Sequence, residues 1–209
     1  LFDPYWSDPE YDVYYRMLNA GIRLPASTGS DWYICSANRV YAYTGGPFQY
    51  DSWLEALKNG RTFITNGPAL SLQVGDDSPG AEIETSAGRT LPVVVSWQSH
   101  YPITRAEVVC NGSVVAHETF REGSTDGRLE ADLSVSSDGW VAARLSSDAR
   151  DSYSQPVFAH TSPVYVKAGV AGAERSDAAA WFDREIDASL EWVGKKGRFY
   201  SDKQRREIV

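Results

Sequence analysis

The chain has 209 residues, of which 42% are hydrophobic and 23% are charged, and its formal net charge is -8. This composition is that of a folded globular protein and excludes disordered, collagen-like and disulfide-scaffold classes. The sequence lacks the run of roughly 18 apolar residues that a membrane-spanning helix needs, and its first residues do not form a signal peptide. We therefore expect a soluble chain with no membrane partner, whose compartment is unknown.

The charge is unevenly distributed along the chain. Residues 195–209 carry six Lys or Arg and two acidic residues, so this segment contributes +4 and the residues before it carry -12. Because acidic surfaces repel phosphates, we expect no nucleic-acid partner. The basic segment is interpreted as the solvated face of a helix. The chain begins at Leu1 rather than Met and ends in a helical run without a C-cap, so we expect both ends to be cut.

Two short helices are predicted in the first 70 residues. The sequence Ser-Asp-Pro-Glu at Ser7 resembles a capping box, and it precedes a helix over residues 11–20 that a glycine ends. The sequence Ser-Trp-Leu-Glu at Ser52 is a second capping box and opens a helix that Gly60 ends. β-Branched and aromatic residues predict two strands in this region, at residues 39–43 and 62–65.

From residue 69 to residue 168 the hydrophobic period changes to two, which is typical of strands. Asn111-Gly112 and Asp126-Gly127 are interpreted as tight turns between alternating runs. The pattern predicts an antiparallel Ig-like β-sandwich. Its eight expected strands lie at residues 69–74, 91–97, 106–110, 114–118, 129–135, 140–145, 157–160 and 164–167.

The last segment, 169–209, is predicted to be helical. A helix opening at Ser176 places Phe182, Ile186, Leu190 and Val193 on one face, which must pack on another surface. We expect this segment to pack back on the part of the chain formed by residues 1–68.

The residue types that serve in catalysis or metal binding form few recognisable motifs in this sequence. His100, His117 and His160 lie in or beside predicted strands, without the spacing that places two metal ligands on one face, so we interpret them as surface or core-edge residues. Asp31 follows a run of small residues at a strand end, a common place for a metal ligand or base in α/β enzymes. An Asp that stabilises a turn fits the same spacing.

Three stretches of the sequence resemble one enzyme family. Residues 14–32, 38–41 and 60–68 are similar to the closing third of the CehA/McbA-type metallohydrolases, a branch of the PHP-like (polymerase and histidinol phosphatase) superfamily. Residues 158–166 and the helix around 181–193 are similar to the end of the same proteins. The resemblance implies a distorted α/β barrel that binds divalent metals and hydrolyses ester, amide, carbamate or phosphoester bonds, followed by an Ig-like sandwich.

The resemblance also implies roles for individual residues. Asp31 matches the Asp of the last Asp-x-His motif of the barrel and would be a metal ligand, whereas Tyr33 stands where the family has the His. Asn38 and Arg39 would position a substrate oxygen. The intact protein would hold Zn, Mn or Fe with histidines upstream of Leu1. Because one carboxylate cannot hold a catalytic ion, we expect this chain alone to be inactive and to bind no metal tightly.

These inferences define an α+β chain with three expected parts. Residues 1–68 would be the C-terminal fragment of a PHP-type α/β barrel, residues 69–168 the sandwich, and residues 169–209 the helical segment. The favoured function is the C-terminal part of a metal-dependent hydrolase of small-molecule substrates. An alternative is a β-sandwich module that binds carbohydrate or protein without catalysis, with Trp97 and Trp140 either in its core or in a sugar platform. A third is an assembly domain that forms a homo-oligomer.

Overall fold

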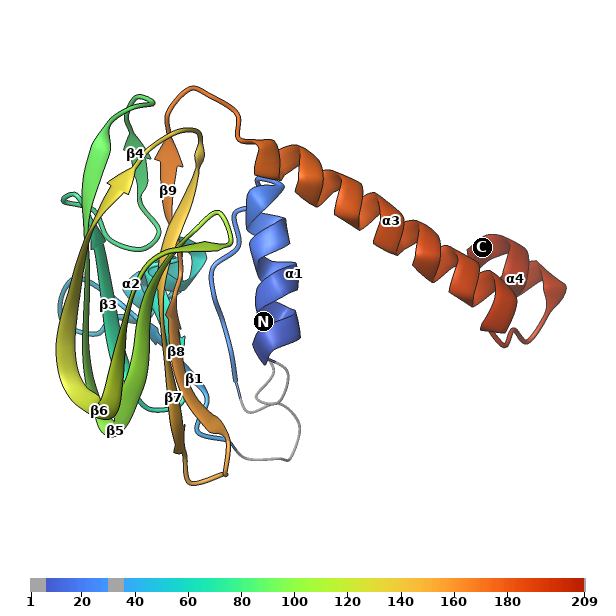
Figure 1. Ribbon diagram of the computed structural model, residues 1–209. Helices are drawn as coiled ribbons and strands as arrows, with labels where there is room; N and C mark the ends of the chain where they lie inside the picture. Colours follow the sequence, from blue (N-terminus) through green and yellow to red (C-terminus); the bar gives the residue numbers. More distant parts are fainter. Residues whose placement is uncertain (1–6, 30–35, 209) are drawn as a thin grey trace.

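The computed structural model describes residues 7–29 and 36–208, which form a body of strands, one helix lying on that body, and a long helix that projects from it (Figure 1). The helices are α1 (Ser7–Asn19), α2 (Tyr50–Lys58), α3 (Ala173–Lys196) and α4 (Asp202–Ile208). The strands are β1 (Arg39–Ala42), β2 (Thr62–Thr65), β3 (Ala69–Val74), β4 (Glu82–Glu84), β5 (Thr90–Cys110), β6 (Ser113–Ser134), β7 (Gly139–Arg150), β8 (Pro156–Thr161) and β9 (Val164–Lys167).

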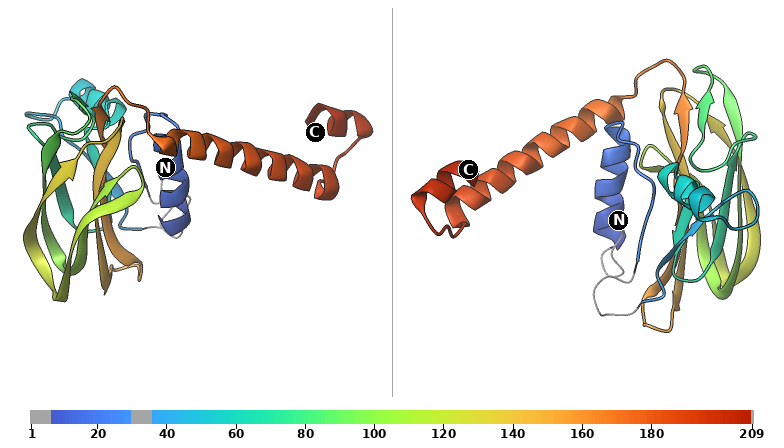
Figure 2. Two further views of the ribbon diagram at one scale, coloured as in Figure 1. Left: turned by 45° about the horizontal axis from the view of Figure 1, so that its top comes forward. Right: turned by 180° about the vertical axis from the view of Figure 1, so that it is seen from behind.

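The strands form a two-layered β-sandwich, as the period-two pattern predicts (Figures 1 and 2). Strand order runs β1-β2-β8-β7-β5-β3, with β6 beside β5, and with β9 between β4 and β7. The two longest strands belong to both layers. The first part of β5 pairs with β3 and with the end of β6, whereas its last part pairs with β7 and the start of β6. The pairs are antiparallel except for β4 with β9, which are parallel.

Two hydrophobic clusters form the core. One lies between the layers, where Val95, Ile103, Val108 and Leu145 are buried, and it includes Trp97. The other lies between the sheet and α1, and it includes Trp140. Both tryptophans are therefore core residues and not sugar platforms.

The sequence prediction of eight short strands is corrected in the middle of the sandwich. Residues 91–97 and 106–110 lie in the single strand β5, and residues 114–118 and 129–134 lie in β6. Asp126-Gly127 is not a turn, because Gly127 lies within β6 opposite Trp97. A Cβ atom at residue 127 would lie 2.2 Å from the Trp97 ring, so the glycine is required for close packing. The short strand β4 is not predicted at all.

The Asn-Gly turn is confirmed. Asn111 and Gly112 have φ values of 50° and 88°, and they join Cys110 of β5 to Ser113 of β6. Both central residues of a type I′ turn need positive φ, and Asn and Gly are the residues that adopt it most easily. The helix predicted at Ser52 exists, but its N-cap is Gln49 and the Ser52 hydroxyl donates to the Gln49 carbonyl, so the capping interpretation is wrong.

The described part of residues 1–68 extends the sandwich. β1 pairs antiparallel with β2, and β2 pairs antiparallel with β8, so both strands continue the sheet formed by later strands. The described residues show no barrel. α1 lies across the outer face of this sheet (Figure 1).

The C-terminal helices project away from the body. Only the start of α3 lies beside α1, and the rest extends outward to α4 (Figures 1 and 2). The helix begins after Gly172 rather than at Ser176. Among the described residues, no helix is both long enough and apolar enough to cross a membrane.

Candidate functional site

Of the three predicted site residues, the structure describes two. Asp31 lies outside the described residues. Asn38 is buried, its Nδ2 donates to the Thr28 hydroxyl at 3.4 Å, and its Oδ1 has no hydrogen-bond partner among the described residues. Arg39 is exposed and its Nε donates to the Ala37 carbonyl at 2.9 Å. The structure therefore brings Asn38 beside the segment that leads to Asp31 but does not direct Arg39 toward it.

The residues described do not fit a metal ion. No three His, Cys, Asp or Glu side chains within residues 7–29 and 36–208 come together as a possible metal site. His100 and His117 are exposed, as expected. His160 is fully buried, which corrects its interpretation as a surface or core-edge residue.

His160 belongs to a network of buried polar side chains under α1. Its Nδ1 lies 2.6 Å from the Thr161 carbonyl, which can only accept, so Nδ1 carries the proton and Nε2 accepts. The Tyr15 hydroxyl donates to Nε2 at 2.7 Å. The Tyr11 ring stacks on the imidazole at a centroid distance of 5.1 Å. The imidazole is enclosed by α1, so these side-chain contacts attach the helix to the sheet.

The hydrogen-bonded network of His160 and Tyr15 continues through two charged side chains on the same face of the sheet. Arg144 lies within 3.5 Å of the Tyr15 hydroxyl and also donates to Glu107. Burial disfavours the Glu107 carboxylate, but hydrogen bonds from Arg144 and Arg105 outweigh this effect and hold its pKa below the usual value. Burial raises the pKa of Tyr15 to about 12. The phenol is therefore neutral and the ion pair charged at neutral pH.

The buried histidine makes stability depend on pH. Burial lowers the pKa of His160 from 6.5 to about 3, so the unfolded chain binds a proton there before the folded chain does. Stability contributed by neutral His160 is present above pH 6.5 and decreases as the pH falls toward 3, by up to about 1.4 kcal/mol per pH unit. Urea unfolding at several pH values should show this slope, and His160→Gln should reduce it. Exposed His117→Gln is the control, and an equal loss of slope in both variants would contradict the assignment.

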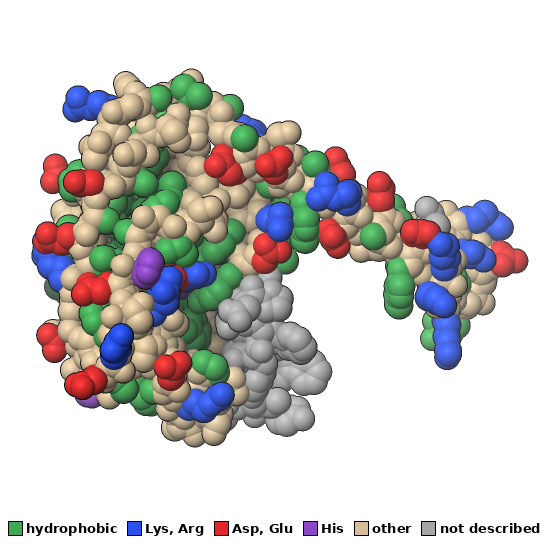
Figure 3. Space-filling model, in the orientation of Figure 1, with side chains coloured by type: hydrophobic (Ala, Val, Ile, Leu, Met, Phe, Trp, Pro, Cys, Tyr) green, Lys and Arg blue, Asp and Glu red, His purple; other side chains and the backbone are tan. Residues whose placement is uncertain are grey.

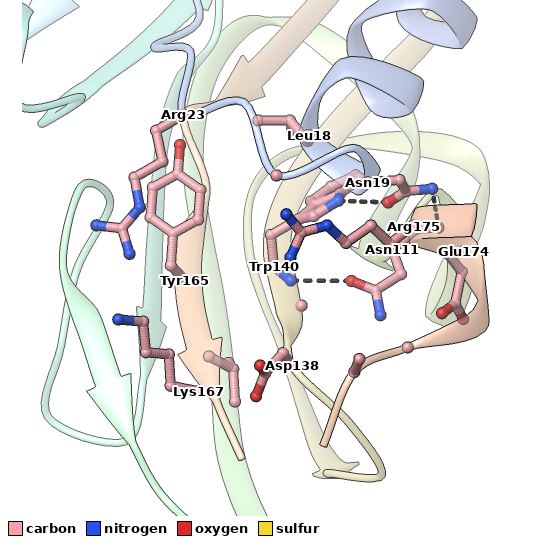
Figure 4. A pocket seen from close by; sticks show the side chains of 15 residues that line it. Leu18, Asn19, Arg23, Asn111, Asp138, Trp140, Tyr165, Lys167, Glu174 and Arg175 are labelled. Carbon is pink, nitrogen blue, oxygen red and sulfur yellow. Dashed lines mark hydrogen bonds between the residues drawn. The ribbon is translucent and has the colours of Figure 1, made fainter. Parts of the chain in front are cut away.

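One pocket lies where α1, α3 and the sheet meet (Figure 4). It has a volume of about 200 Å³, and many of its side chains are already paired with one another. The Trp140 indole donates to Asn19 at 2.7 Å, and the Trp140 backbone N–H donates to Asn111 at 2.9 Å. Asp138 accepts from two backbone N–H groups of the segment that leads to α3. We interpret this pocket as the joint that seats α3.

A second cavity opens between the two layers. It has a volume of about 490 Å³ and lies between β1 and β2 of one layer and β3 of the other. Aromatic and aliphatic side chains form most of its lining, with Tyr41, Tyr43, Phe63, Leu70, Leu72 and Pro79 among them. The Tyr41 and Phe63 rings are stacked, with centroids 5.0 Å apart. A cavity of this size and lining is typical of sites that accept apolar groups.

Exposed aromatic side chains continue from this cavity along the chain. Tyr41 and Tyr43 on its rim, and Phe48 and Tyr50 a few residues later, are all exposed. Tyr43 and Phe48 are each 70% exposed. We call these four residues and the cavity the β1 aromatic surface. Large apolar patches on a folded chain mark interaction sites more often than not.

A cation also lines this cavity. Arg61 Nε is buried and has no hydrogen-bond partner among the described residues. The Arg61 guanidinium carries further N–H donors, so a ligand group that accepts hydrogen bonds would be favoured in this cavity. The sequence predicts the strands that carry Tyr41 and Phe63, but not the cavity, because β3 belongs to the other layer. In the sequence, the run of aromatic residues within 41–50 is the feature that could have indicated this surface.

Comparisons with known proteins find only distant structural matches. No family model matches the sequence, and no curated protein matches it. A CARDB domain from Pyrococcus furiosus, solved in solution, covers 48% of this chain and 96% of its own at 14% identity and a TM-score of 0.33. Fibronectin(III)-like modules of CbhA from Clostridium thermocellum cover 47% and 98% at 18% identity and a TM-score of 0.30. The sheet topology itself therefore establishes the fold as an α+β chain with an Ig-like β-sandwich and a C-terminal helix.

Proposed function

We propose that this chain is an interaction module that binds another protein, or another protein domain, through the β1 aromatic surface. The observation that carries the proposal is an apolar cavity of about 490 Å³ that is lined by the exposed side chains of Tyr41 and Tyr43. Exposure of such an apolar surface to water is unfavourable, and covering it with a partner lowers the free energy of the system. The cavity would accept one large apolar side chain of the partner, with the exposed rings around it.

The position of β1 supports a protein partner over a small ligand. β1 is the edge strand of its layer among the described residues, since it pairs with β2 alone. An edge strand offers backbone donors and acceptors to an extended peptide, and a neighbouring pocket supplies side-chain specificity. The two features adjoin, because Tyr41 and Ala42 of β1 line the cavity. Arg61 would hydrogen-bond a carbonyl or carboxylate of that partner.

Selection of random peptides displayed on phage tests the proposal. We expect enriched peptides to share a large apolar residue and to bind the wild-type chain. Tyr43→Ser should weaken their binding about tenfold, because aromatic anchors dominate such interfaces. Tyr153→Ser removes another exposed tyrosine, in the turn before β8, and should leave binding unchanged. Failure to enrich any peptide, or equal binding to both variants, would contradict the proposal, and specific retention on a glycan array would favour carbohydrate instead.

A second candidate is the C-terminal part of a PHP-like metal-dependent hydrolase with residues 1–68 as part of its α/β barrel. Two things favour it: the resemblance of residues 14–32 and 60–68 to that family, and the buried Asn38 Oδ1 beside the segment leading to Asp31, which lacks a donor among the described residues. In this account the β1 aromatic surface would contact the rest of the enzyme. The described residues form no metal site, so we derive no catalytic step.

Metal content and activity distinguish the two candidates. The chain alone, and a polypeptide extended by the sequence encoded upstream of Leu1, would be assayed for bound Zn, Mn and Fe and for hydrolysis of aryl ester, carbamate and phosphate-ester substrates. The hydrolase account expects metal and activity in the extended polypeptide, with loss of both in its Asp31→Asn variant. An extended polypeptide that remains metal-free and inactive would contradict it and leave the interaction module unaffected.

A further inference from the structure

Most of α3 lies away from the body of the chain (Figures 1 and 2). Its first turns pack against the body, since Ala178 is buried and the Arg16 guanidinium of α1 lies 4.7 Å from the centre of the Trp181 ring. Beyond them two apolar side chains in the middle of the helix are open to solvent. Ile186 is 57% exposed and Leu190 is 44% exposed.

The two exposed residues lie on one face of the helix together with half-buried Phe182 and Val193. Phe182, Ile186, Leu190 and Val193 follow one another at spacings of four, four and three residues, which places them on one side of an α-helix. The 24 residues of α3 span about 36 Å. An isolated helix of this length gains most of its stability from packing its apolar face on a partner. The expected packing of this face on the body of the chain is not seen among the described residues.

The charges along α3 and α4 change sign halfway. Residues 173–191 carry six acidic and two basic side chains, whereas residues 192–208 carry six basic and two acidic ones. Figure 3 shows the Lys and Arg side chains gathered at the far end, over α4 and the end of α3. The helical segment therefore has an acidic half near the body and a basic half at its tip.

We propose that α3 pairs with α3 of a second copy of this chain in an antiparallel arrangement. In that arrangement the acidic half of each helix faces the basic half of the other, and the apolar faces cover each other along the seam. A parallel arrangement would place like charges together and is disfavoured for the same reason. The partner that complements both the apolar face and the charge gradient of α3 is thus α3 itself.

Sedimentation equilibrium of the full chain tests this pairing. We expect a dimer whose dissociation constant rises with salt, because the charge pairs are exposed. Ile186→Glu should make the chain monomeric, and circular dichroism would show that the sandwich remains folded. A monomer in the wild-type chain at about 100 μM, or a dimer that Ile186→Glu leaves intact, would overturn the proposal.

Charge reversal tests the antiparallel orientation. Lys196→Glu with Arg198→Glu makes the basic half more acidic and should weaken the dimer about tenfold. Adding Asp183→Lys with Asp187→Lys in the same chain should restore the dissociation constant, because the introduced lysines of each helix then face the introduced glutamates of the other. Lys58→Glu with Arg89→Glu carries the same change of net charge on the body and should have no effect. A combined variant that stays as weak as the first would overturn the antiparallel orientation.

Discussion

Replacing Trp140 with alanine is expected to destabilise the chain by about 3–5 kcal/mol, because the change removes a large buried aromatic side chain. Trp140 is 1% exposed, and its ring packs against that of Tyr15 at a centroid distance of 5.0 Å. Its indole also donates to Asn19 at the end of α1. The side chain therefore joins the sheet to α1 through both packing and a hydrogen bond.

Urea unfolding measures this effect, and hydrogen exchange of the α1 amides shows whether the helix loosens before the sandwich unfolds. Trp192→Ala is the matched control, because Trp192 is 64% exposed on α3. At low chain concentration we expect it to change the free energy of unfolding by about 0.5 kcal/mol or less. Equal effects of the two substitutions would contradict the placement of Trp140 in the core beneath α1.

Glu107→Gln is expected to cost about 2–3 kcal/mol, since it leaves two arginines without their carboxylate. Glu107 is buried and accepts from Arg105 Nε at 2.5 Å and from Arg144. The expected cost lies below that of a fully buried pair, because water partly screens the two guanidinium groups. The loss should also weaken the contact of Arg144 with Tyr15, and so the attachment of α1.

The control for this variant is Glu130→Gln. Glu130 also accepts from an arginine two residues away on its strand, Arg128, at 2.5 Å, but both side chains are exposed. Pairs of this kind contribute about 0–1 kcal/mol. Chemical denaturation of both variants at neutral pH compares them directly. A Glu107→Gln chain as stable as Glu130→Gln would show that the buried pair does not hold this face of the sheet.

Local patterns predict those elements whose ends carry their own signals. β3 and β9 have the predicted bounds, because alternating side chains and flanking turn residues mark them. α1 ends as predicted before Gly21, whose φ is 89°. The sequence pattern divides each long strand in two, because each contains turn-forming residues, and only packing against the opposite strand shows that these stay extended.

The candidate sites depended on contacts between distant residues. His160 and Tyr15 are 145 positions apart, so no local spacing predicts their hydrogen bond. The inter-layer cavity likewise arises because β2 and β3, close in sequence, belong to different layers. Of the residues implied by the family resemblance, Asn38 donates to the Thr28 hydroxyl and Arg39 donates to the nearby Ala37 carbonyl.

The most direct test of the proposed interaction module is hydrogen–deuterium exchange of the full chain with and without a peptide selected on it. The account predicts slower exchange in residues 39–43 and 61–63 and around Leu70 and Pro79, which line the cavity and its edge strand. It predicts no change along α3 at low chain concentration. Protection confined to α3 or to the joint beside Asn111, with none around the cavity, would contradict it.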